Sequence, residues 1–432
     1  MIDEIPTIFI TKTTALKARV KQRYSDFIVE EIYESTIEQN ENLIEKKCSV
    51  QRFNIPFEQR KPFEKMIIPT NENNKEHLVL ELEKINTDTN KAIAMLARGL
   101  GLSTKRIGYG GLKDKRAITC QRISVFDPPL EKIINFGAKG LELRNPVWGE
   151  RIELGDLKEN YFTIILRDIS ASEDEIKNII NDFSKQIVNG IPNFFGTQRF
   201  GGKRMITHKI GKLLIKEKYK DAIIAYLTET FEEEKEDIKS ARINLAKTLD
   251  FKKALREFPS ECRTELAILN HLVRKENDFM GALNALPKKT RYLFVHAYQS
   301  YIFNKIIKKR LEEFGDKALQ PIGEEKTSNG IPLVILAGFE TKYSPGRIGE
   351  IEKQILEEEN VCFEDFKVRA LSELSSKGSE KEIALFPKNF LLKRIFEDDF
   401  NEGKKAIEIE FSLSKGNYAT TVLKELIKEE IF

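Results

Sequence analysis

The sequence predicts an α+β protein in which a mixed or antiparallel sheet with helices is interrupted by a largely helical α/β insertion. The 432 residues exceed the size of one ordinary hydrophobic core, which favours two domains. Strand and helix patterns alternate up to about residue 202 and return after residue 382, and the stretch between them is mostly helical in pattern. We therefore expect one domain built from residues 1–202 and 383–432, and an insertion domain over residues 203–382.

The N-terminal part contains several stretches with the pattern of β-strands. Residues 76–85 show the clearest alternation, with leucine at every second position (Leu78, Leu80 and Leu82), as in a half-buried strand. The other strands that we expect in this part lie at residues 23–32, 120–126 and 161–169.

An amphipathic helix is expected directly after the leucine-rich strand, over residues 89–103. Thr89 is the expected N-cap, and Gly99 or Gly101 is expected to end the helix. Its apolar face would consist of Ile93, Leu96, Ala97 and Leu100. Further along the chain, we expect helices at residues 172–190 and 291–315, a β-like stretch at 330–340, and a strand, glycine loop and closing helix within 405–427.

The near balance of charge hides local segregation. Charged residues make up 32% of the chain, and the net charge is +3. Eight lysines and arginines but one acid lie between Asn189 and Lys220, whereas six acids lie within Glu229–Asp237. Basic segments with interleaved aromatic residues suit a phosphate backbone with unstacked bases. A second basic segment surrounds Asp114, between Ser103 and Phe126, and each of the two segments lies beside a glycine-rich turn. We therefore favour an RNA or DNA partner over the alternative that both segments are ordinary solvent-exposed surface.

Cysteine and histidine spacing gives no sign of a metal site. The four cysteines form no CxxC pair, and the four histidines are equally scattered (Cys48, Cys120, Cys262 and Cys362; His77, His208, His271 and His296). The N-terminal start is polar, with Asp3 and Glu4 and no apolar signal region, and no stretch reaches the length of a membrane span. We therefore expect no metal and a cytoplasmic setting.

One carboxylate, Asp114, stands alone in the glycine-rich segment GYGGLKDKRAITCQRISV, residues 108–125. No other acid lies between Ser103 and Phe126, and that window holds six cations (Lys105, Arg106, Lys113, Lys115, Arg116 and Arg122). The segment lacks the GxxxxGK[ST] phosphate loop, the several acids of a magnesium site and the second carboxylate of an acid–base pair.

An aspartate surrounded by cations has two possible roles. Neighbouring positive charge stabilises the ionised carboxylate, which suits nucleophilic or base chemistry on a substrate that carries phosphates. Alternatively, Asp114 is a surface turn residue that pairs with Lys113 or Arg116. The residue pattern alone leaves both interpretations open.

Five segments together resemble the TruD family of tRNA pseudouridine synthases. The segment GLKDKRAITCQ is similar to the family motif that holds its catalytic aspartate, which corresponds to Asp114. The other four matches follow the family order and span nearly the whole chain: VKQRYSDFIVEEI (20–32), IPNFFGTQRFG (191–201), AYQSYIFNKIIKKR (297–310) and GNYATTVLKEL (416–426).

The resemblance implies a pseudouridine-synthase catalytic core interrupted by a family-specific insertion. It also implies conversion of uridine to pseudouridine in tRNA, typically at position 13, without cofactor or metal. Asp114 would act on a flipped-out uridine by attacking C1′, by taking a proton from C2′, or by adding to C6 of the base. These three routes stay open.

Supporting residues also carry over by their place in the motifs. Lys21 is the expected counter-cation of Asp114, and Lys113 is less suited because adjacent side chains often point apart. Phe195 is expected to stack on the uracil, and Asn193 to read its edge or to hold the loop. The remaining expected residues are Phe27 and Tyr418 as substrate contacts, with core packing as the alternative for Phe27, and Thr119 and Gln121 as supports of the Asp114 turn. Tyr418 replaces the phenylalanine expected in some relatives.

Two other functions compete with the enzyme. One is a non-catalytic RNA-binding or RNA-folding protein on the same scaffold, and the other is a helical interaction platform centred on residues 203–382. The intact Asp114 motif favours the enzyme, which we expect to be a monomer that binds tRNA.

Overall fold

The computed structural model describes residues 8–36, 43–60, 66–328 and 330–429. The chain forms two compact units: residues 11–190 with 385–431, here called the sheet unit, and residues 1–10 with 191–384 and 432, here called the helical unit. The first boundary lies between Gly190 and Ile191, so residues 191–202 belong to the helical unit. The assignment of catalysis to residues 1–202 and 383–432, and of an insertion to residues 203–382, stays a prediction.

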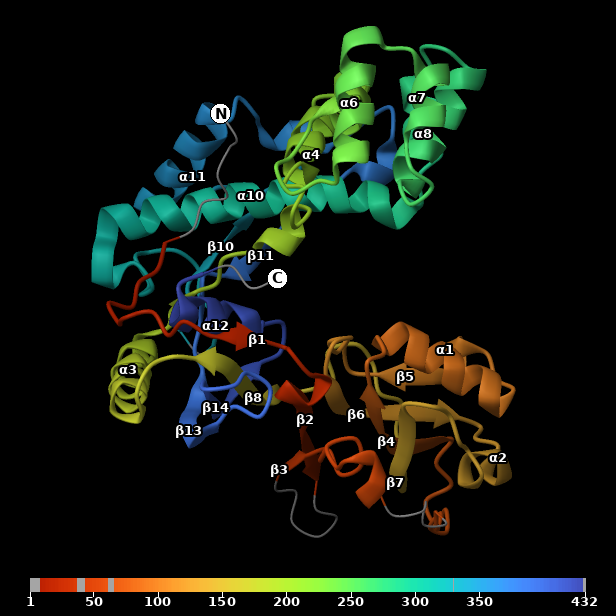
Figure 1. Ribbon diagram of the computed structural model, residues 1–432, viewed down its shortest axis with the longest axis vertical. Coiled ribbons are helices and arrows are strands. Elements are labelled where there is room, and N and C mark those ends of the chain that lie inside the picture. The colour runs from red at the N-terminus through yellow and green to blue at the C-terminus, as the bar shows by residue number, and fades with distance from the viewer. Residues whose placement is uncertain (1–7, 37–42, 61–65, 329, 430–432) are drawn as a thin grey trace. The chain divides into compact units, whose positions relative to one another are not determined.

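A ten-stranded sheet dominates the sheet unit, with the strand order β13-β14-β8-β2-β6-β4-β7 and with β1, β3 and β5 attached to β8, β2 and β6 (Figure 1). Its strands are β1 (Arg19–Val20), β2 (Phe27–Thr36), β3 (Leu43–Lys47), β4 (His77–Ile85), β5 (Ile107–Tyr109), β6 (Ile118–Phe126), β7 (Leu141–Gly149), β8 (Glu159–Ile169), β13 (Lys388–Glu397) and β14 (Lys405–Ser414).

The sheet is mixed, because β2 and β6 pair in parallel whereas the neighbouring pairs β2–β8 and β4–β6 are antiparallel. The α+β class with a mixed sheet is therefore confirmed. Each of the four expected N-terminal strands is present as β2, β4, β6 or β8. The strand expected at residues 23–32 begins with a short 3-10 helix (Tyr24–Asp26), and β2 follows it.

Helix α1 (Thr89–Leu100) packs on the sheet as its spacing predicted. Its apolar face and the leucines of β4 share one buried cluster, which comprises Leu78, Leu80, Leu82, Ile93, Leu96, Ala97 and Leu100 among others. Gly101 ends the helix in the left-handed conformation, with φ of 71°. The expected N-cap is wrong: Asp88 caps the helix by accepting a hydrogen bond from the N–H of Lys91, and Thr89 is the first helical residue.

The other helices of the sheet unit are α2 (Leu130–Ile134), α3 (Glu173–Gln186) and α12 (Ala419–Ile427). A capping box between Ser172 and Glu175 begins α3, and a 3-10 turn over Ile187–Asn189 leads to Gly190, which has φ of 92°. The strand, glycine loop and helix expected within residues 405–427 are β14 and α12.

The helical unit is organised around the long helix α10 (Lys288–Phe314), which corresponds to the expected helix at residues 291–315 and ends one residue earlier (Figure 1). Its other helices are α4 (Thr207–Ile215), α5 (Tyr219–Thr228), α6 (Glu236–Thr248), α7 (Phe251–Glu257), α8 (Arg263–Arg274), α9 (Phe279–Asn284) and α11 (Gly346–Glu358). Its short strands are β9 (Ile191–Pro192), β10 (Leu333–Leu336) and β11 (Ser379–Glu382), and β12 (Ala384–Leu385) lies at the second unit boundary.

Candidate active site

The Asp114 loop, residues 110–117, connects β5 to β6 at the edge of the buried α1–β4 core. Strand β5 pairs with β6 in an antiparallel register that sets Gly108 opposite Ser124. A Cβ atom on Gly108 would lie 2.2 Å from the carbonyl oxygen of Ile152, so only glycine fits this approach to the loop. The carboxylate of Asp114 is accessible, with 46% of its side chain exposed.

Lys21 is the cation that lies beside the Asp114 carboxylate. Its Nζ donates to Oδ1 of Asp114 over 3.2 Å. The same ammonium group lies 3.9 Å from the centroid of the Phe27 ring, so the ring and the carboxylate hold it from two sides. Lys21 has φ of 57°, a left-handed conformation that costs a residue with a Cβ free energy. The chain therefore accepts local backbone strain where this lysine meets Asp114.

Lys84 supports the Asp114 loop from beneath. It is fully buried at the end of β4, and its Nζ donates to the backbone carbonyl oxygen of Asp114 over 2.9 Å. Burial lowers the pKa of Lys84 to about 8, and the negative charge of Asp114 opposes that shift. A buried ammonium group thus contributes positive charge directly under the loop.

Lys113 points away from the Asp114 carboxylate. Its Nζ lies 3.1 Å from the carboxylate of buried Glu31 and donates to Oδ1 of Asn160 over 2.7 Å. The backbone N–H of Lys113 donates to the hydroxyl of Thr89 over 2.9 Å. Lys113 therefore anchors the loop to β2 and β8 through its side chain, and to α1 through its backbone.

Thr89 and Gln121 complete the support of the loop. The hydroxyl of Thr89 donates to Oε1 of Gln121 over 3.2 Å, and Nε2 of Gln121 donates to the carbonyl oxygen of Gly111 over 3.0 Å. Thr119 is fully buried on β6, and within the described part of the chain its hydroxyl has no hydrogen-bond partner. Thr89 does not cap α1 because its hydroxyl joins the helix start to the Asp114 loop.

The two candidate aromatic residues of the sheet unit have very different exposure. Phe27 is 1% exposed, and its ring meets the Phe162 ring edge-on at a centroid distance of 6.0 Å. Tyr418 is 63% exposed and directly precedes α12. Phe27 is thus placed to hold Lys21, whereas the Tyr418 ring is open to a ligand.

The Phe195 segment, residues 193–195, lies in the helical unit. The side-chain amide of Asn304 on α10 accepts from the N–H of Phe195 and donates to its carbonyl oxygen, each over 2.9 Å. The ring is half-buried and meets the Phe303 ring edge-on. Asn193 is 2% exposed, and its Nδ2 donates to the carbonyl oxygen of Glu382 over 3.2 Å. The segment is therefore fixed mainly by amide and backbone groups.

Two cations lie near the Phe195 ring. The guanidinium carbon of Arg199 is 5.4 Å from the ring centroid, and Nζ of Lys381 is 5.2 Å from it. Burial lowers the pKa of Lys381 to about 8, and the charge of Arg199 lowers it further, whereas Glu382 raises it. An aromatic ring beside two cations can contact both a base and its phosphate.

Comparison with known proteins identifies the family. The family model described as "tRNA pseudouridine synthase D (TruD)" matches residues 6–325 and 317–426. The chain belongs to the TruD family. It is thus an isomerase, a tRNA pseudouridine synthase. Within the described residues, no helix is long and apolar enough to cross a membrane.

Archaeal relatives extend this similarity over most of the chain. A curated protein of Methanococcoides burtonii named "Probable tRNA pseudouridine synthase D" is 38% identical over 82% of this chain and 88% of its own length. A protein of the same name from Methanosarcina acetivorans is 36% identical over 98% of this chain and 95% of its own. The crystal structure of a TruD protein from Methanosarcina mazei superposes with a TM-score of 0.76 at 32% identity, covering 99% and 97% of the two chains.

The sequence did not reveal several residues that hold the Asp114 loop and the Phe195 segment in place. Lys84, Glu31 and Asn160 are separated from Asp114 by dozens of residues, and only the strand register brings them under the loop. The one available signal was the position of Lys84 in the alternating strand. Lys84 stands two residues after Leu82, so it continues the row of positions that the leucines occupy on the buried face, where a charged residue is unusual. Asn304 stood in a family-like segment, but its pairing with Phe195 was not predicted.

Proposed function

We propose that this chain converts uridine to pseudouridine at position 13 of tRNA, with Asp114 as the catalytic carboxylate. The observation that carries the proposal is the ion pair between the accessible Asp114 and Lys21 on a loop anchored from below. Lys21 contacts the carboxylate itself and Lys84 holds the backbone of Asp114, so the group that would attack or remove a proton has a fixed position. The support by Gln121 and Thr89 fixes where that carboxylate points.

The reaction breaks the C1′–N1 bond of uridine and forms a C1′–C5 bond. The target base must first leave its stack, at a cost of roughly a few kcal/mol. The Asp114 carboxylate could then attack C1′, remove the C2′ proton or add to C6. A kinetic isotope effect with deuterium at C2′ separates the second route from the other two, because only that route breaks the C2′–H bond.

The other candidate residues receive roles from their placement. We assign Phe195 and Tyr418 to stacking with RNA, since both rings have exposed surface. Phe27 acts through Lys21, whose ammonium group its ring faces. Asn193 acts by holding its own loop to the carbonyl oxygen of Glu382. We retain tRNA as the partner, and a monomeric cytoplasmic enzyme, as further parts of this proposal.

The test is position-specific mapping on an unmodified tRNA transcript. The wild-type chain is expected to produce a carbodiimide-dependent reverse-transcription stop at position 13, and a transcript with cytidine there should give none. Asp114→Asn should remove the stop while tRNA still binds. An equal stop with both proteins would reject Asp114 as the catalytic group. Binding without any stop for the wild type would favour the non-catalytic RNA-binding protein.

A further inference from the structure

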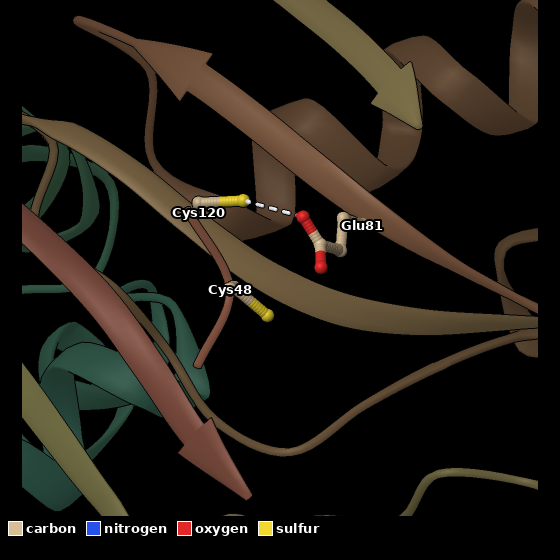
Figure 2. A group of neighbouring side chains, drawn as sticks. All are labelled: Cys48, Glu81 and Cys120. Atoms are coloured by element: carbon tan, nitrogen blue, oxygen red, sulfur yellow. Dashed lines mark hydrogen bonds between the residues drawn. The ribbon is translucent and has the colours of Figure 1, made fainter. Parts of the chain in front are cut away.

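Three side chains with metal-ligating atoms meet inside the sheet unit, and we call Cys48, Glu81 and Cys120 the thiol–carboxylate cluster. Cys48 follows β3, Glu81 lies in the middle of β4, and Cys120 lies on β6 (Figure 2). All three are buried, and one donor atom from each lies within 4.8 Å of the other two. Among the described residues, no other group of this kind meets that criterion. Asp114 is not part of it.

Glu81 is a buried carboxylate with little compensation. Glu81 is 9% exposed. Within the described part of the chain, it forms no ion pair and accepts one hydrogen bond, from the thiol of Cys120 over 3.7 Å (Figure 2). A thiol is a weak donor, and burying an ionised carboxylate without a strong partner is costly. The Glu81 carboxyl group therefore has room for a further partner, which a cation can provide.

The neighbouring arginines do not supply that charge directly. Strand register places Arg122 and Arg144 on either side of Glu81. The guanidinium of Arg122 instead lies 3.5 Å from Glu31, and that of Arg144 pairs with Glu83. Both arginines are thus engaged by other carboxylates, and Glu81 faces the two thiols.

We propose that Cys48, Glu81 and Cys120 form a binding site for Zn²⁺ or a divalent transition metal ion of similar softness. Two thiolates and a carboxylate are a donor set that zinc accepts, at about 2.3 Å from sulfur and about 2.0–2.2 Å from oxygen. Donor atoms in a tetrahedral site with these bond lengths lie roughly 3.5–4 Å apart. The Cys120 sulfur and a Glu81 oxygen are already 3.7 Å apart, and the donor atoms of all three residues lie within 4.8 Å of one another. A water molecule or a nearby protein group can complete the tetrahedron.

The surrounding charge suits the filled site better than the empty one. A divalent ion with two thiolates and one carboxylate carries a single negative charge, and Nη2 of Arg144 already lies 3.8 Å from the sulfur of Cys120. Thiols bind a metal ion as thiolates, so binding releases protons. Metal affinity is therefore expected to rise with pH.

The consequence of binding would be structural. The ion would join the segment after β3 to β4 and β6, the strands that carry Lys84 and Gln121. Cys120 itself stands between Thr119 and Gln121, whose side chains point to the opposite face of β6. A filled site would stiffen the strands that support the Asp114 loop without contacting the substrate.

Cobalt titration of the full chain tests this proposal. After removal of metals with a chelator and reduction of thiols, the wild type should bind about one Co²⁺ per chain, with visible bands and a thiolate charge-transfer band of tetrahedral coordination. Added Zn²⁺ should bleach these bands and raise the melting temperature. Cys48→Ser and Cys120→Ser should each weaken binding by about 100-fold or more, and Glu81→Gln by about 10-fold or more.

Cys262→Ser and Cys362→Ser serve as matched controls, since those thiols lie outside the cluster. Both should bind Co²⁺ like the wild type, and circular dichroism establishes that each variant is folded. If Cys120→Ser does not fold, Glu81→Gln and Cys48→Ser carry the test. Absence of Co²⁺ binding at micromolar concentration, or equal binding by the cluster variants, would overturn the proposal. So would a mass shift showing a Cys48–Cys120 disulfide in the protein as purified.

Discussion

The Asp114 loop and the Phe195 segment are held in place by different physical means. At Asp114, charged groups dominate, because Lys21 pairs with the carboxylate and buried Lys84 bonds to the backbone carbonyl oxygen. At Phe195, the neutral amide of Asn304 holds both backbone groups of the residue. The cations near Phe195, Arg199 and Lys381, lie beside its ring.

This difference suggests different contributions of the two regions to the proposed reaction. Support by charge links the Asp114 loop to pH, since its strength depends on the protonation of a lysine whose pKa is about 8. The amide that holds the Phe195 backbone does not titrate, and the lysine of this segment whose pKa is about 8, Lys381, lies beside the ring. We therefore expect substitutions around Asp114 to change the chemical step and its pH dependence, and substitutions around Phe195 to change RNA binding.

Lys21→Met is expected to have the largest effect among the supporting residues. Losing the ion pair with Asp114 should lower the single-turnover rate by about 10²-fold or more, because the carboxylate is no longer held in one position for the reaction. Lys21→Arg should recover part of the rate, and Lys139→Met, at an exposed lysine outside the Asp114 loop, should change it little. A Lys21→Met enzyme with the wild-type rate would show that the ion pair between Lys21 and Asp114 is not needed for the reaction.

Phe195→Ala is expected to follow. Loss of base stacking of about 1–3 kcal/mol should lower kcat/KM by roughly 10- to 100-fold. Asn304→Ala should produce a smaller loss of the same kind, because it loosens the segment but keeps the ring. The double variant should lose little more than Phe195→Ala. Additive losses in this double-mutant cycle would show that Asn304 acts independently of Phe195.

Lys84→Met should lower the single-turnover rate by about tenfold at pH 7, because the positive charge beneath Asp114 is lost. The wild-type rate should also decline as pH rises through about 8, where Lys84 loses its proton, and Lys84→Met should lack that decline. Lys84→Arg should retain the charge beyond this range. A decline near pH 8 that persists in Lys84→Met belongs to another group.

The contribution of Lys84 to the free energy of unfolding should change with pH in the opposite direction from the reaction rate. Its folded pKa of about 8 is below the ordinary value of 10.5, so the folded state binds fewer protons than the unfolded state between these values. The contribution of this residue to stability therefore rises with pH over that window and is smallest below it. Lys84→Met should accordingly keep or raise the melting temperature at pH 7, which thermal unfolding measures.

Tyr418→Phe is expected to have the smallest effect. The ring stays available for stacking and only the hydroxyl is lost, so kcat/KM should change by less than about twofold. Tyr418→Leu should show a clear loss because the aromatic face is removed. If Tyr418→Phe were as impaired as Tyr418→Leu, the hydroxyl and not the ring would be the functional group.

Patterns that depend on neighbours in the sequence predicted much of the fold. Leu78, Leu80 and Leu82 indicated β4, and the spacing of Ile93 to Leu100 indicated α1, because periodicity reports which face is buried. The N-cap was misjudged since Asp88 and Thr89 are both suitable caps, and the tertiary contacts of the Thr89 hydroxyl decided between them.

Contacts between distant strands could not be predicted in this way. Lys84 reaches the Asp114 loop, and Cys48 meets Glu81 and Cys120, only through the register of β2, β4 and β6. Motif similarity located Asp114 and Lys21 because both stand in segments that resemble the family. The physical roles of the residues around them required the geometry.

The central claim is that Asp114 performs the chemical step. The most direct test measures single-turnover pseudouridine formation and tRNA affinity in parallel for the wild type and Asp114→Asn. For Asp114→Asn we expect loss of the rate by about 10⁴-fold or more, with tRNA affinity within a few-fold of the wild type. An Asp114→Asn enzyme that retains a rate near that of the wild type would contradict it.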